Sequence, residues 1–191
     1  MSDLTISREN VIKNYKASDD NTKKTLEAIF GKDLFKPKDI TERIKTFEDA
    51  MAELDSNHPF ICEYRALCAK SDDISPDLLA YQKLRIITAA LNEGWKPEFT
   101  EDEWRYYPWF YLYTQADLDD MEDSEKKERR MIYTGDYQTE FAGFGFAYSP
   151  NAPSIAPAYI GSRLCLRTSD LAVYCGKQFI GIWADFNLIR K

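Results

Sequence analysis

The sequence predicts an α+β fold: a helical N-terminal half, a small antiparallel sheet in the C-terminal half and a long buried C-terminal helix. Three observations favour it. Apolar residues recur at helical spacing up to about residue 93. Residues 104–113 are rich in aromatic, β-favouring side chains, and residues 141–148 alternate as in a strand. The last twenty or so residues carry a wide apolar stripe at helical spacing.

The N-terminal segment predicts a helical hairpin over residues 7–30. Ser7 can cap the first helix, Asp19 or Asp20 can cap the second, and Gly31 is a suitable stop. Residues 32–40 contain a proline and read as an extended linker. We therefore expect a small helical hairpin module over residues 1–36, joined to an α+β body over residues 37–191.

The first part of the body predicts three helices, over residues 46–54, 60–69 and 76–93. Thr46 with Asp49 has the spacing of a capping box, and Pro76 after Ser75 is a strong helix start. Gly94 ends the third helix. On that helix, Arg85 and Asn92 are expected to lie away from the core-facing side.

Three strands are predicted next, over residues 104–113, 141–148 and 160–166, and a helix over residues 169–187. Pro108 implies an edge position or a bulge in the first strand. Gly143 and Gly145 share one face of the second strand, so another element can pack close to its backbone. Residues 117–130 are strongly charged and predict either a solvated loop or a frayed helix.

Composition limits the classes of function. The chain of 191 residues has no signal-peptide pattern and no apolar run that could span a membrane, so we expect a soluble, cytoplasmic protein without membrane contact. The net charge is −7, and residues 98–128 hold eleven acids against three bases, which disfavours non-specific DNA binding. Four cysteines without a paired motif and one histidine favour buried reduced thiols over a metal site, and no cofactor is expected.

Several stretches together resemble a known group of proteins: residues 42–50, 90–97, 106–110 and 161–166. As a set they are similar to a family of uncharacterised proteins carried by phages and prophages of gut anaerobic bacteria. The similarity covers roughly residues 42–188 in patches. It implies an origin in a mobile element, and the family has no assigned activity from which catalytic residues could be transferred.

One candidate binding site lies at the start of the last helix. If residues 160–166 form a strand with Leu164 and Leu166 facing the core, Arg163 and Arg167 project together from the other face. They lead into Thr168 and Ser169, where free backbone N–H groups and the helix dipole favour an anion. The alternative is that Thr168 or Ser169 only caps the helix while the arginines pair with acids of residues 98–128.

A second candidate is an aromatic interaction surface made by Trp104, Tyr107, Trp109 and Tyr111. Such rings can stack single-stranded bases, but that use needs interleaved basic residues, and only Arg105 lies among them. Packing in the core and at its rim is the commoner use of aromatic side chains. A partner protein or a second copy of the chain could also cover such a surface.

These observations favour a non-enzymatic accessory or interaction protein of phage origin, with a protein partner or self-association. No nucleophile elbow, phosphate loop or zinc-protease motif is present in the sequence, so we predict no catalytic residues and no metal ligands. The alternatives are a single-stranded nucleic-acid-associated protein, or a small anion-binding protein or enzyme with its site at the start of the last helix.

Overall fold

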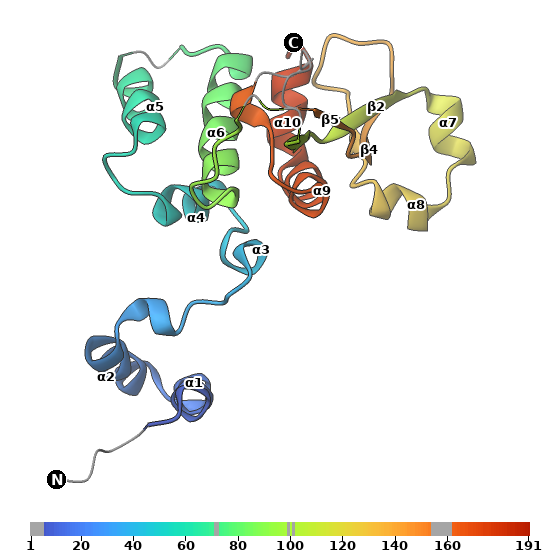
Figure 1. Ribbon diagram of the computed structural model, residues 1–191. Coiled ribbons are helices and arrows are strands. Elements are labelled where there is room, and N and C mark those ends of the chain that lie inside the picture. Colours follow the sequence, from blue (N-terminus) through green and yellow to red (C-terminus); the bar gives the residue numbers. More distant parts are fainter. Residues whose placement is uncertain (1–5, 71–72, 99, 101, 154–161) are drawn as a thin grey trace, which may run out of the picture. The chain divides into compact units, whose positions relative to one another are not determined.

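The computed structural model describes residues 6–70, 73–98, 100, 102–153 and 162–191 (Figure 1). The chain divides into two compact units, residues 1–43 and residues 44–191. Helices occupy the N-terminal half, and a three-stranded antiparallel sheet followed by two helices occupies the C-terminal half. The predicted α+β fold class is therefore confirmed. No helix of the described residues is both long and apolar enough to cross a membrane.

The first unit contains α1 (Arg8–Ala17), α2 (Asp20–Phe30), the 3₁₀ helix η1 (Lys32–Leu34) and α3 (Ile40–Arg43). Asp19 caps α2, its side chain accepting a hydrogen bond of 2.8 Å from the backbone N–H of Thr22. Tyr15 stacks on Phe35 with a centroid distance of 4.0 Å. Both predicted helices are present, but the first part of the expected extended linker is a 3₁₀ turn.

The second unit begins with α4 (Phe47–Glu53), α5 (Pro59–Lys70) and α6 (Pro76–Leu91). The capping box of α4 forms as expected: the Asp49 N–H donates to Thr46 Oγ1 at 3.1 Å, and the Thr46 N–H donates to the Asp49 carboxylate at 2.9 Å. Helix α6 contacts α4 and α5 as well as the C-terminal α10 (Ile180–Asn187). Figure 1 shows α10 between α6 and the sheet.

The sheet has the order β2–β4–β3, with β4 (Gly143–Tyr148) between β2 (Trp109–Tyr113) and β3 (Ile132–Tyr133). The predicted strand over residues 104–113 is interrupted: β1 (Trp104–Tyr106) pairs separately with β5 (Asn151–Pro153). Pro108 lies in the interruption, where a residue without a backbone N–H costs no ladder hydrogen bond. The register also shifts between Trp109 and Phe110. Strand β2 is thus an edge strand with a bulge at its start.

The small-residue face of β4 is closely covered, as the sequence predicted. A methyl group at Gly143 would lie 2.9 Å from Met131 Sδ, and one at Gly145 would lie 2.8 Å from Met131 Cε. Before Met131, the charged segment forms α7 (Gln115–Asp120) and α8 (Asp123–Glu128), which we call the α7–α8 segment (residues 115–128). Leu118 is 2% exposed and anchors it. Of the two structures left open for this segment, it therefore forms helix.

The C-terminal region differs from its prediction in two ways. The long helix is present as α9 (Ser169–Gln178) and α10, separated at Phe179, whose backbone is not helical (φ −111°, ψ 28°). The expected strand over residues 160–166 is wrong where it can be compared. Residues 160–161 lie outside the described residues, Ser162–Leu164 forms the 3₁₀ turn η2, and Leu166 makes only a single bridge to Tyr106.

Candidate functional site

The start of α9 is held by the protein's own groups. Thr168 is the N-cap, and its hydroxyl accepts a hydrogen bond of 3.3 Å from the backbone N–H of Leu171. Ser169 is the first residue of the helix. The Thr168 hydroxyl, one of the groups predicted to bind an anion, therefore caps the helix, as the alternative interpretation expected.

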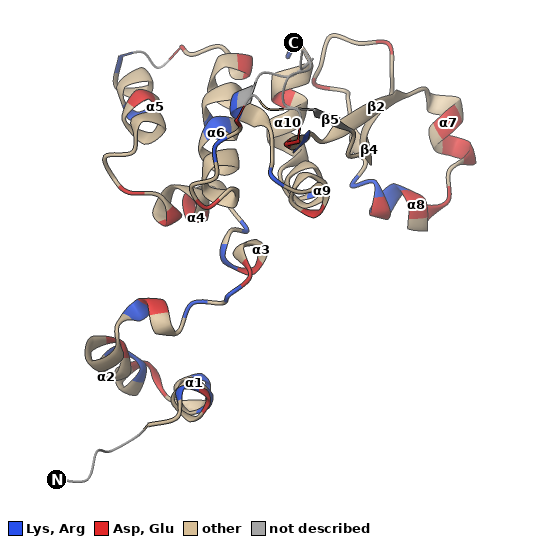
Figure 2. Cartoon of the chain, in the orientation of Figure 1, with Lys and Arg blue, Asp and Glu red and all other residues tan. Residues whose placement is uncertain are grey.

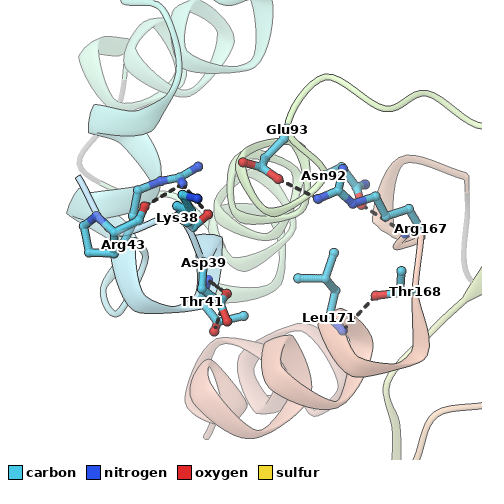
Figure 3. A network of polar contacts seen from close by, with 10 residues as sticks. Lys38, Asp39, Thr41, Arg43, Asn92, Glu93, Arg167, Thr168 and Leu171 are labelled. Carbon is cyan, nitrogen blue, oxygen red and sulfur yellow. Dashed lines mark hydrogen bonds and ion pairs between the residues drawn. The ribbon is translucent and has the colours of Figure 1, made fainter. Parts of the chain in front are cut away.

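Arg167 is tied to the C-terminal end of α6 (Figure 3). Its guanidinium donates to the Glu93 carboxylate at 2.5 Å, and its backbone N–H donates to Asn92 Oδ1 at 3.1 Å. The Asn92 amide in turn donates to the carbonyl of Cys165 at 2.9 Å. Asn92 is only 5% exposed, so one buried side chain pairs with the backbone on both sides of Leu166. The expected pairing of Arg167 with acids of residues 98–128 is replaced by pairing with Glu93.

Figure 3 also shows Arg43 donating to the carbonyls of Pro37 and Lys38, both at 3.0 Å, within the first unit.

Arg163 does not share a strand face with Arg167. It lies in η2 and is exposed, whereas Leu164, Cys165 and Leu166 are all buried. The alternation that would bring the two arginines together requires extended backbone, and residues 162–164 are a 3₁₀ turn. The four residues predicted to form an anion site thus divide into a cap, an ion pair, an exposed turn residue and the first residue of α9.

The predicted aromatic surface is partly assembled. Trp104 and Tyr111 are 46% and 48% exposed, and Trp109 is partly exposed. The prediction that Tyr107 belongs to this surface is wrong, because its side chain is buried, at 6% exposure. Burial raises the pKa of the Tyr107 hydroxyl to about 12, so it stays neutral in the protein interior.

Tyr148 of β4 also belongs to this surface, although strict alternation along the strand would place it on the face of Phe144 and Phe146. The ring centroids of Tyr148 lie 6.3 Å from those of Trp109 and 6.1 Å from those of Tyr111. The register shift at Trp109 explains the change, because Trp109 pairs with Tyr148 while Phe110 pairs with Phe146, leaving Ala147 unpaired in between. We call Trp109, Tyr111 and Tyr148 the aromatic face. Pro108, which implied an edge or a bulge, was the sequence signal for it.

Two hollows flank β2. One, of about 430 Å³, lies against the α7–α8 segment; we call it the acidic groove, and it is lined by Tyr111, Leu112, Tyr113, Asp117, Asp120, Met121 and Glu125. The other, of about 400 Å³, is mainly apolar and lies between β2, β4 and the end of α10. Tyr111 and Leu112 line both hollows. An exposed edge strand thus separates two places where a ligand's side chains could be received.

A further hollow of about 390 Å³ lies between α8, β4 and α9. Its charged residues pair with one another: Arg129 with Glu125 at 2.8 Å and Lys177 with Glu128 at 3.8 Å. Within the described parts of the chain, no group of three or more His, Cys, Asp or Glu side chains could hold a metal ion.

Comparison with known proteins adds no assignment to these features. No protein-family model, curated protein or solved structure matches the chain. The resemblance to phage and prophage proteins therefore stays a prediction, and the aromatic face with its flanking hollows is the candidate site.

Proposed function

We propose that this chain is a non-enzymatic interaction protein that binds a protein partner through the aromatic face. The observation that carries the proposal is the contact of three aromatic rings, two from the edge strand β2 (Trp109 and Tyr111) and one from the neighbouring β4 (Tyr148). Tyr111 and Tyr148 are each 48% exposed. Aromatic side chains are enriched in protein interfaces, where they bury a large area with little loss of side-chain freedom. A contiguous exposed apolar patch on one chain is typical of such a site.

The chemistry of the face also favours contact over catalysis. Partial desolvation raises the pKa of Tyr148. An ordinary tyrosine already titrates near pH 10, so this phenol stays protonated at neutral pH. It can donate one hydrogen bond and stack against a partner. This is what an interface needs, and it supplies no general base.

The two alternatives find less support in the same geometry. A nucleic-acid strand stacked on these rings would place its phosphates near Asp117, Asp120 and Glu125 of the acidic groove. An anion at the start of α9 would have to compete with Glu93 for Arg167. An accessory role in a phage or prophage, which the resemblance implies, is consistent with an interaction protein.

The test is affinity capture with variants of the aromatic face. Tyr111→Ser combined with Tyr148→Ser should lose the partner that the wild-type protein captures, and a melting curve should show that the variant is folded. Tyr133→Ser is the matched control, because Tyr133 is 71% exposed on β3 and lies outside the aromatic face. A partner retained equally by the double variant would refute the proposal.

A further inference from the structure

The acidic groove combines tyrosine rings from β2 with carboxylates from the α7–α8 segment. We infer that it receives a lysine or arginine side chain from a cationic segment of the protein partner. This inference rests on the proposed function and names the chemistry of the partner. Three observations support it. A carboxylate and a tyrosine ring hold a cation of the protein itself at the border of the groove, a further ring and carboxylate line the groove, and the surrounding segment is negatively charged.

At the border of the groove, where Glu125 also lines the hollow between α8, β4 and α9, the protein holds one cation of its own. Arg129 Nε donates to Glu125 Oε1 at 2.8 Å, and its guanidinium lies 6.0 Å from the centre of the Tyr113 ring. A carboxylate and a tyrosine face therefore hold a guanidinium at one end of this surface. The Glu125 carboxylate is the main reason that the pKa of Arg129 is raised, so this cation is firmly charged.

Tyr111 and Asp120 both line the acidic groove and supply the same two kinds of group, a tyrosine ring and a carboxylate. The Tyr111 ring is 48% exposed, and its centroid lies 6.4 Å from that of Tyr113. Asp120 is exposed, and among the described residues no hydrogen bond or ion pair holds its carboxylate. An arriving guanidinium or ammonium group could contact this ring and this carboxylate together, as Arg129 contacts Tyr113 and Glu125.

The remaining acid of the groove keeps its negative charge. The Asp117 carboxylate accepts hydrogen bonds from the hydroxyl and the N–H of Thr114, at 2.7 Å and 2.8 Å. These bonds lower the pKa of Asp117, so it is ionised at neutral pH.

The surrounding charge selects a cation and disfavours a second copy of the chain. The α7–α8 segment carries seven acids and two bases, and Figure 2 shows acidic residues along both of its helices. A symmetric dimer through β2 would bring the same surface of two copies together, and with it two negatively charged segments. A basic segment would instead be attracted and its arrival accelerated.

The size and position of the groove suit an extended segment. Its volume is about 430 Å³ and it is widely open to solvent, so a long side chain can lie along it. It lies beside β2, which is at the edge of the sheet, and peptides commonly bind along such edges. Leu112, which also lines the groove and is 37% exposed, offers an apolar contact.

The inference is tested by titrating the isotope-labelled protein with a short peptide of alternating arginine and leucine, followed by NMR. The expected result is saturable shifts at Tyr111, Asp120 and Met121 that weaken as salt is raised, because screening shortens the range of the attraction. The same peptide with glutamate in place of arginine should cause none. Asp120→Asn and Tyr111→Leu should each weaken binding about threefold, and together about tenfold.

The matched control carries Asp136→Asn and Tyr133→Leu, which remove the same groups from exposed positions outside the groove and should leave the affinity unchanged. Equal binding of the glutamate peptide, or no effect of Asp120→Asn, would overturn the cationic assignment. If the captured partner depends on Tyr111 and Tyr148 but not on Asp120, the interaction function stands and only this assignment falls. Shifts in the groove caused by single-stranded oligothymidine would overturn both.

Discussion

Replacing Asn92 should show how much more a buried polar contact contributes to stability than a neighbouring exposed one. Its side chain is 5% exposed and connects the end of α6 to residues 165–167 through two hydrogen bonds. Asn92→Ala removes both bonds at once. The carbonyl of Cys165 and the N–H of Arg167 then each lose a hydrogen bond at a site that admits little water.

The expected cost follows from these two groups. A buried or partly buried polar group left without a partner costs about 1–3 kcal/mol, with the lower end applying to the half-buried Arg167 N–H. The free energy of unfolding should therefore fall by about 2–4 kcal/mol. For a chain of this length, each kcal/mol corresponds to about 2–4 °C, so the Tm should fall by about 4–16 °C.

The assay is urea unfolding followed by circular dichroism and tryptophan fluorescence. Glu93→Gln is the control, because it weakens the neighbouring ion pair with Arg167, which is about one-third exposed and should contribute at most about 1 kcal/mol. If Asn92→Ala is as stable as Glu93→Gln, the two hydrogen bonds do not secure this connection and the reasoning fails.

Three further predictions concern packing, thiol reactivity and protonation. Gly176→Ala should destabilise the protein by about 1–3 kcal/mol, because its methyl group would lie 2.7 Å from Phe146 and from Pro108. The methyl group of the control, Gly181→Ala, meets nothing within 4 Å, so this variant should be more stable than the wild type by about 0.5–1 kcal/mol. Equal melting temperatures of the two variants would contradict this. Burial raises the pKa of Cys165 to about 11 and that of Cys175 to about 12, whereas Cys62 and Cys68 are exposed. Ellman's reagent should therefore react rapidly with two thiols in the native protein and with four after unfolding. Partial burial, with nearby Lys96 and Arg85, lowers the pKa of His58, whose Nδ1 accepts a hydrogen bond of 3.3 Å from the Phe60 N–H. The pKa of His58 in the folded protein is below the unfolded value of about 6.5. The contribution of His58 to stability is therefore complete above about pH 6.5 and is lost as the pH falls through the folded-state pKa. An NMR titration of this single histidine with a midpoint at or above about 6.5 would contradict the prediction.

Local signals predicted the helices well. The capping box at Thr46, the proline at position 76 and the stop at Gly94 act within a few residues, so the sequence alone contains what they need. At the end of α6, Glu93 and Gly94 both have positive φ, 48° and 85°, a conformation that glycine adopts without strain. The alternation of glycine and aromatic residues, each recurring at every second position, likewise indicated which face of β4 would be covered.

Long-range pairing explains what could not be predicted. Arg85 was expected away from the core but is 7% exposed, because Glu63 pairs with it at 2.5 Å and the Phe60 ring lies 4.0 Å from its guanidinium. Asn92 is buried because residues 165–167 lie against it. The buried thiols expected at all four cysteines occur only at Cys165 and Cys175. No pattern within one helix reports such partners.

Only part of the candidate site could be predicted from the sequence, because the rest depends on pairing between distant residues. The aromatic composition of residues 104–113 indicated a surface, and Trp109 and Tyr111 belong to it. Periodicity could not place Tyr107 inside or Tyr148 outside, since both depend on where the chain is interrupted and where the bulge falls. Asp120 and Tyr111 line the same groove only because the α7–α8 segment lies against β2.

Recognition of a cationic partner segment by the acidic groove is tested most directly by one comparison of dissociation constants. The alternating arginine–leucine peptide is titrated into the wild-type protein and into the variant with Tyr111→Leu and Asp120→Asn, at the same salt concentration. An approximately tenfold weaker affinity of the variant is predicted from the loss of one ring contact and one exposed carboxylate. Equal dissociation constants for the two proteins would contradict it.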